Sequence, residues 1–151
     1  MELARKFEVE LSNLDQAVGT FSKAVNLEQQ GIFDDLTADL IKNGKIQKFE
    51  YCSELCWKVS KMFLELRTGE IEVSPKQVYK KMFVTKLIDK DLFEAIFKTI
   101  DDRNKLSHIY KEEMYDVVYS NLPQHLNAFA RLLQIFLDSN RPGSEYEILT
   151  T

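Results

Sequence analysis

The segment RNKLSHIY, residues 103–110, brings an arginine, an amide and a histidine together within six positions of the chain. His108 can donate or accept a proton near neutral pH. The guanidinium of Arg103 can stabilise negative charge on a phosphoryl group. These two groups are sufficient in principle to cleave RNA without a metal, by in-line attack of the RNA's own 2′-hydroxyl. Asn104 is placed to orient such a site.

Arg103 falls on the apolar stripe of the helix that is expected to precede the motif. It lies seven residues after Ile96 and three after Ile100, and both spacings return to the same helix face. Asn104 follows Phe97 by seven residues and Ile100 by four, so it is also predicted to face inward. An inward arginine is costly unless an anion meets it. With only five arginines against fifteen lysines, the choice of arginine here favours recognition of a carboxylate or phosphate.

A structural interpretation of the same motif stays open. Nearby carboxylates can neutralise Arg103, and the candidates are Asp101, Asp102 and Glu54. In that case His108 forms a hydrogen bond at a helix end and the motif does no chemistry. We count Glu54 and Asp102 as residues that support the site.

Glu54 also belongs to a row of charges on an earlier helix. Glu50, Glu54 and Lys58 follow one another at steps of four, which places them on one helix face. The spacing predicts either a ladder of charge pairs along that helix or, in Glu54, a side chain that holds Arg103 in position.

The pattern of Arg103, Asn104, His108 and Tyr110 resembles the signature of the HEPN superfamily. A tyrosine two residues after the histidine resembles the toxin of HEPN–MNT toxin–antitoxin pairs. The segment IQKFEYCSELCWK, residues 46–58, is similar to a helix of the nucleotidyltransferase substrate-binding-protein branch of that superfamily. The resemblance covers residues 3–137.

The resemblance implies a homodimer in which two copies of the motif meet at one cleft, and a minimal nucleotidyltransferase (MNT) as partner. It implies that Arg103 and His108 act in metal-independent RNA cleavage. It also implies that the partner neutralises the toxin by attaching adenylyl groups to Tyr110. No cofactor is expected. The chain has no Gly-Ser followed by Asp-x-Asp, so it is not itself a nucleotidyltransferase.

Two other hypotheses belong to different classes of function. The chain can be a non-catalytic subunit that binds a nucleotide or docks the transferase through the same cleft. It can also be a helical dimer in which the motif is only structural.

Helices must position these residues, because apolar side chains recur at steps of three and four along most of the chain. We expect helices at 2–29, 43–67 and 75–83, then from Asp89 or Asp91 to 106, and from 112 to 137 with a kink or division at Pro123. Gly31 and Gly69 are expected to end the first two helices, and residues 32–40 to form a connection or short turn. The prediction is an all-α, antiparallel bundle of four or five helices in one domain, 1–138, with a tail at 139–151.

Composition excludes several other classes. Ten Phe, six Tyr and one Trp in 151 residues argue against disorder, and five Gly with three Pro are too few for a turn-rich β fold. No glycine-rich phosphate loop occurs. Two His and two Cys are too few for a zinc finger, so Cys52 and Cys56 are expected to be reduced core residues. With no signal region and no membrane-length apolar run, we expect a soluble, cytoplasmic protein.

Charge is distributed unevenly along a chain whose net charge is −4. Residues 74–90 hold five lysines and a single acid, Asp89. Such a face can meet an anion or RNA, or it can be an ordinary solvated helix face. Trp57 is expected to anchor the core, and His125 to be a surface or packing residue.

Overall fold

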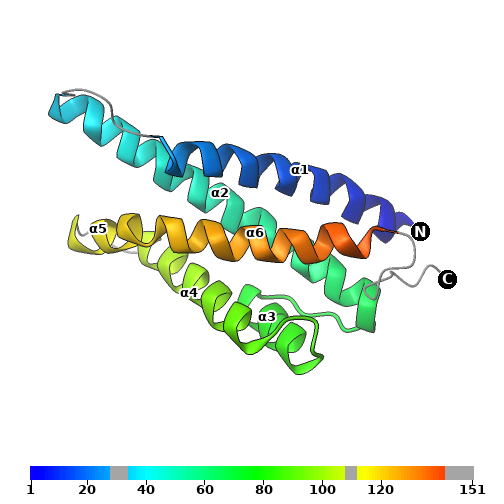
Figure 1. Cartoon of the computed structure of the whole chain (residues 1–151). Helices are drawn as coiled ribbons and strands as arrows, with labels where there is room; N and C mark the ends of the chain where they lie inside the picture. The colour runs from blue at the N-terminus through cyan, green and yellow to red at the C-terminus, as the bar shows by residue number, and fades with distance from the viewer. Residues whose placement is uncertain (28–33, 108–111, 142–151) are drawn as a thin grey trace.

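The computed structural model describes residues 1–27, 34–107 and 112–141, and every regular element in those ranges is an α-helix. The helices are α1 (Glu2–Val25), α2 (Asp35–Thr68), α3 (Pro75–Val84), α4 (Lys90–Leu106), α5 (Glu112–Ser120) and α6 (Leu122–Ser139) (Figure 1). The prediction of an all-α bundle is confirmed.

Helix α2 forms the centre of the bundle and contacts each of the other described helices. Figure 1 shows α1 and α4 running in one direction and α2 and α6 in the other, so the long helices are antiparallel. Helix α6 contacts α1, α2 and α4. This arrangement places the end of α4, where the motif begins, against the first turns of α6.

Two groups of phenylalanine rings hold α1, α2 and α6 together. The ring of Phe7 lies 6.1 Å from those of Phe63 and Phe136, measured between centroids. The second group consists of Phe21, Phe49 and Phe129. All six side chains are fully buried. Burial of rings this large, with edge and stacked contacts, is the main source of stability for such a bundle.

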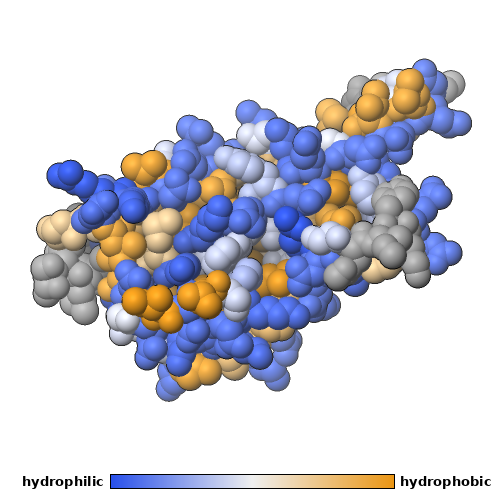
Figure 2. Space-filling model, turned by 180° about the vertical axis from the view of Figure 1, so that it is seen from behind, coloured by the Kyte–Doolittle hydropathy of each residue, from blue (hydrophilic) through white to orange (hydrophobic). Residues whose placement is uncertain are grey.

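Helix α2 begins eight residues earlier than predicted, at Asp35 instead of residue 43. The side chain of Asp34 accepts a hydrogen bond from the backbone N–H of Thr37 at 2.7 Å and so caps the first turn. Leu36 and Leu40 are 68% and 62% exposed, so this end of α2 buries no apolar stripe that periodicity could detect. The prediction of a connection at residues 35–40 was therefore wrong. Figure 2 shows apolar surface gathered on this projecting end of the molecule.

The other boundaries lie close to the predicted ones. Helix α1 ends at Val25, and Gly31 lies outside the described residues. Asp89, rather than Asp91, caps α4, because its side chain accepts from the N–H of Leu92 at 2.8 Å. Pro123 lies in the first turn of α6, where its missing N–H costs nothing, and thereby divides α5 from α6.

Helix α6 continues to Ser139, one residue beyond the predicted domain boundary. Most of the predicted tail, residues 142–151, lies outside the described residues. Cys52 and Cys56 are free and buried, as predicted, and burial raises the pKa of Cys52 to about 12. Trp57 is half-buried and packs against the core. In the described ranges no helix has both the length and the apolar character needed to cross a bilayer.

Helix α2 ends as predicted, at Gly69, which has a φ of 79° in the left-handed region. The N–H of Gly69 donates to the carbonyl of Glu65 at 2.8 Å and satisfies one of the last carbonyls of the helix. No heavy atom lies within 4 Å of the position that a Cβ would take at Gly69. The glycine is therefore required for its backbone conformation and not for space.

We expect Gly69→Ala to lower the free energy of unfolding by about 1–2 kcal/mol, the cost of left-handed backbone for an L-residue. Gly44→Ala is the matched control, since Gly44 lies within α2 and also faces open space. There alanine should raise the free energy of unfolding by up to about 1 kcal/mol, because it favours helix more than glycine does. Urea denaturation of both variants measures the two values, and changes of the same sign would contradict this account.

Candidate functional site

Arg103 lies in the last turn of α4 and is half-buried. Its Nη1 donates to the hydroxyl of Ser107 at 2.7 Å. Its Nε is buried and has no hydrogen-bond partner within the described ranges of the chain. Among the residues that the structure describes, no carboxylate forms an ion pair with Arg103. One edge of the guanidinium is thus held by a neutral hydroxyl while a donor on the same group is left unsatisfied.

An unsatisfied buried donor costs about 1–3 kcal/mol, and more when the group is charged. An arginine in this state is suited to an anion that brings acceptor oxygens, such as a carboxylate or phosphate. Anion recognition by Arg103, expected from its place on the apolar stripe, stays a prediction.

The three carboxylates considered as structural partners of Arg103 have other contacts. Asp101 pairs with Lys76 at 3.0 Å. Glu54 pairs with Lys58 at 3.3 Å and accepts from the indole N–H of Trp57 at 3.2 Å. The ladder interpretation of Glu54 thus describes its observed contacts, and none of these contacts is with Arg103.

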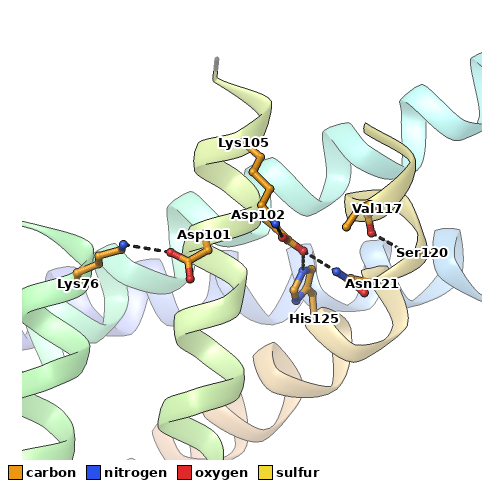
Figure 3. A network of polar contacts seen from close by, with 8 residues as sticks. All are labelled: Lys76, Asp101, Asp102, Lys105, Val117, Ser120, Asn121 and His125. Atoms are coloured by element: carbon orange, nitrogen blue, oxygen red, sulfur yellow. Dashed lines mark hydrogen bonds and ion pairs between the residues drawn. The ribbon is translucent and has the colours of Figure 1, made fainter. Parts of the chain in front are cut away.

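Asp102 is the centre of a buried polar network (Figure 3). Only 4% of Asp102 and 2% of His125 are exposed. One carboxylate oxygen of Asp102 lies 2.6 Å from Nε2 of His125 and accepts from the side-chain amide of Asn121 at 3.0 Å. The other oxygen accepts from Lys105 at 3.2 Å. The network joins the end of α4 to the start of α6.

The ring of His125 is fixed from a second side. It stacks on Phe49 of α2 with centroids 4.9 Å apart and an interplanar angle of 21°. Burial by itself would raise the pKa of Asp102, but hydrogen bonds from His125, Asn121 and Lys105 outweigh it and lower that pKa to about 2. Asp102 is therefore ionised at neutral pH, and its contacts anchor the turn of α4 that carries Arg103.

Asp101 and Asp102, although adjacent in sequence, point to opposite sides of α4 (Figure 3). Asp101 faces Lys76 in the first turn of α3, and Asp102 faces α6. The motif thus follows a helix whose last turns are fixed on two sides.

Asn104 is exposed, which corrects the prediction that it faces inward. The buried face of α4 is centred on residues Leu92, Ile96 and Thr99. Asn104 instead continues the line of Phe97, which is itself only half-buried at the edge of that face. An exposed amide remains available to a ligand beside Arg103.

His108 and Tyr110 lie outside the described residues. The structure fixes what flanks them: α4 ends at Leu106 and α5 begins at Glu112. The catalytic assignment of Arg103, Asn104 and His108 stays a prediction, as does the role of Tyr110.

Sequence reasoning missed the role of His125. It lies three residues after Leu122 and four before Phe129, which places a polar ring on the apolar stripe of α6. A buried imidazole requires a hydrogen-bond partner, and that requirement was the available signal. Which carboxylate supplies the partner depends on how α4 packs on α6. In the described part of the chain, no group of three or more His, Cys, Asp or Glu side chains is placed to hold a metal.

The protein is thus an all-α bundle with an arginine in the last turn of α4, and the buried Nε of that arginine has no hydrogen-bond partner among the described residues. Residues 9–137 match the family described as nucleotidyltransferase substrate binding protein like, and the chain belongs to that family. The predicted resemblance to the nucleotidyltransferase substrate-binding-protein branch is thereby confirmed. No curated protein matches the sequence.

Several solved structures share the fold of this chain. A Thermus thermophilus protein is 23% identical, with a TM-score of 0.70 over 82% of this chain and 98% of its own. A tri-AMPylated Shewanella oneidensis HEPN toxin in complex with its MNT antitoxin is 18% identical, with a TM-score of 0.69 over 87% and 96% of the two chains. A toxin–antitoxin structure with AMP-PNP is 15% identical, with a TM-score of 0.66 over 87% and 95%.

Proposed function

We propose that this protein is a HEPN-type ribonuclease toxin that works with a minimal nucleotidyltransferase as its antitoxin. In this proposal Arg103 stabilises charge on the phosphoryl group, His108 is the acid or base, and Asn104 orients the site. The RNA's own 2′-hydroxyl attacks the adjacent phosphorus, and the bond to the 5′-oxygen of the next nucleotide breaks. A proton leaves the 2′-hydroxyl and another is given to the departing 5′-oxygen, so no metal or cofactor is required.

The observation that carries the proposal is the unsatisfied guanidinium of Arg103. Within the described residues its Nε has no hydrogen-bond partner, and no carboxylate neutralises the charge. A phosphodiester oxygen would accept from the accessible part of this half-buried guanidinium and would gain the most where negative charge increases during attack. Membership of a family whose fold is shared with HEPN toxins in toxin–antitoxin complexes gives independent support.

Homodimerisation and a cytoplasmic location belong to the same proposal. Two copies of the motif meeting across a twofold axis would place two Arg103 side chains beside one anion. The partner would neutralise the toxin by transferring AMP from ATP to the hydroxyl of Tyr110, with release of pyrophosphate. The added group would place new negative charge beside Arg103 and compete with RNA.

The description of the family favours one alternative. In it the chain is a non-catalytic substrate-binding subunit that binds a nucleotide at Arg103 or docks the transferase there. This alternative predicts binding without turnover, whereas the main proposal predicts cleavage.

The test is RNA cleavage by the purified chain in the presence of a metal chelator. We expect cleavage by the wild-type protein, and its loss after incubation with the MNT partner and ATP. Tyr110→Phe should cleave RNA equally well before that incubation and keep cleaving afterwards, because it lacks the acceptor hydroxyl. If the wild-type protein binds RNA or nucleotide and never cleaves, the alternative holds and the ribonuclease proposal is wrong.

A further inference from the structure

A row of three phenylalanine rings lies partly exposed on the side of the bundle where α3 meets α4. Phe83 stacks on Phe93 with centroids 4.8 Å apart and an interplanar angle of only 9°. Phe93 in turn lies 5.1 Å from Phe97. Phe83 is 36% exposed, and the other two rings are half-buried. We call Phe83, Phe93 and Phe97 the aromatic ladder.

Lysines accompany the ladder. The Nζ atoms of Lys76 and Lys80 lie 5.3 Å and 5.9 Å from the centroid of the Phe97 ring. Lys76 is also paired with Asp101. Lys80 is exposed and, within the described residues, forms no ion pair with a carboxylate. Its ammonium can therefore leave the ring for a phosphate without breaking a salt bridge.

The α3 side of the ladder is rich in lysine although the chain as a whole is acidic. From residue 74 to residue 90 there are five lysines against Asp89 alone. That acid is turned toward α6, where Arg131 lies 3.7 Å from it. The ladder thus combines partly exposed rings with lysines on its α3 side, and the α4 carboxylates beside it, Glu94 and Asp101, are paired with Lys90 and Lys76.

The ladder also leads toward the motif. Phe93, Phe97 and Asn104 follow one another at steps of four and seven, so they lie along one side of α4. Phe97 and Asn104 are separated by about 10 Å along the helix axis, from a rise of 1.5 Å per residue. The exposure of Asn104 continues the surface from the rings to the turn that carries Arg103.

We propose that the aromatic ladder and its lysines form a binding platform for single-stranded RNA. This proposal rests on the proposed function, because the bound strand is the substrate delivered to Arg103. Bases stack on the phenylalanine faces, and the lysines contact the phosphates. Bases of a duplex have no free faces, so the platform selects unpaired RNA. The same combination would serve a second protein chain less well, because Lys76 and Lys80 would be desolvated against apolar surface.

The experiment measures binding of a fluorescent oligouridine of about twelve nucleotides, a length within the range of single-strand binding sites, by anisotropy at low salt. His108→Ala serves as background to prevent cleavage. Phe97→Leu keeps an apolar side chain and removes the ring. We expect it to weaken binding by about five- to 150-fold, the fold-change that corresponds to one stacked base. Tyr51→Leu removes an exposed ring on α2 and should leave binding unchanged.

A second pair of variants tests the phosphate contact. Lys80→Gln should reduce the slope of log affinity against log salt by about 0.7, the value for one phosphate of a single strand. Lys98→Gln makes the same charge change on the next residue after Phe97, turned about 100° away around α4, and should leave the slope unchanged.

Three results would overturn the platform: no binding of oligouridine by the background protein, equal binding of a duplex of the same length, or unchanged binding by Phe97→Leu. Light scattering of Phe97→Leu tests whether the ladder instead contacts a second copy of the chain. A halved mass together with unchanged RNA affinity per protomer would show that it does. Failure of the platform is distinguishable from failure of the proposed function. Cleavage by wild type with unaltered binding in Phe97→Leu contradicts only the platform, and ladder-dependent binding without cleavage contradicts only the ribonuclease.

Discussion

Replacing Arg103 by alanine is expected to lower the rate of RNA cleavage by about 100- to 1000-fold, the usual cost of removing a preorganised charge stabiliser. The effect is large because the guanidinium has an unsatisfied buried donor and no carboxylate competitor among the described residues. The free energy of unfolding should change by no more than about 1 kcal/mol, since within the described residues the variant loses a single hydrogen bond, from the guanidinium to the hydroxyl of Ser107. Single-turnover cleavage with a chelator present measures the first quantity, and thermal or urea unfolding the second.

Two further variants serve as controls for the expected loss of cleavage. Arg5→Ala removes an exposed arginine from the first turns of α1 and should cleave RNA like wild type. Arg103→Lys keeps the charge and loses the fork of donors, so its rate should fall between those of wild type and Arg103→Ala. Wild-type cleavage by Arg103→Ala, or equal losses in Arg5→Ala and Arg103→Ala, would remove Arg103 from the mechanism.

Asp102→Ala is expected to lower the free energy of unfolding by about 3–5 kcal/mol, because it leaves His125, Asn121 and Lys105 without their shared acceptor. This is a large fraction of the stability of a small domain. Asp101→Ala is the control: it is the neighbouring residue, and its pair with Lys76 is exposed, so its loss should cost at most about 1 kcal/mol. Urea denaturation at neutral pH measures both, and similar costs for the two variants would contradict the buried network.

The same network predicts how stability depends on pH. The pKa of Asp102 is lowered to about 2 in the folded protein, below its ordinary value of 3.8. Protons therefore bind more readily to the unfolded chain. The difference of nearly two pH units contributes about 2 kcal/mol of stability, which is complete above about pH 5 and is lost as the pH falls toward 2. The stability difference between wild type and Asp102→Ala should shrink over that range, and a difference that is independent of pH would contradict the lowered pKa.

Helix positions were predictable from sequence wherever a helix buries one face. The stripe of α4, the cap at Asp89 and the proline near the start of α6 are local signals, and the structure has them where the sequence places them. The first turns of α2 were missed because Leu36 and Leu40 are exposed and leave no periodic trace. A pattern of side chains reports burial, and a helical turn that buries nothing has no such pattern.

For the site, spacing alone placed Arg103 at the inner edge of α4, because spacing along one helix is a local property. It could not determine which carboxylate pairs with which base. Asp102 pairs with His125 and Asp101 pairs with Lys76 because α4 packs between α3 and α6. The aromatic ladder arose in the same way, since it joins rings of two helices. Contacts between helices depend on crossing angles and distances that no single helix encodes, and only the tertiary structure decides them.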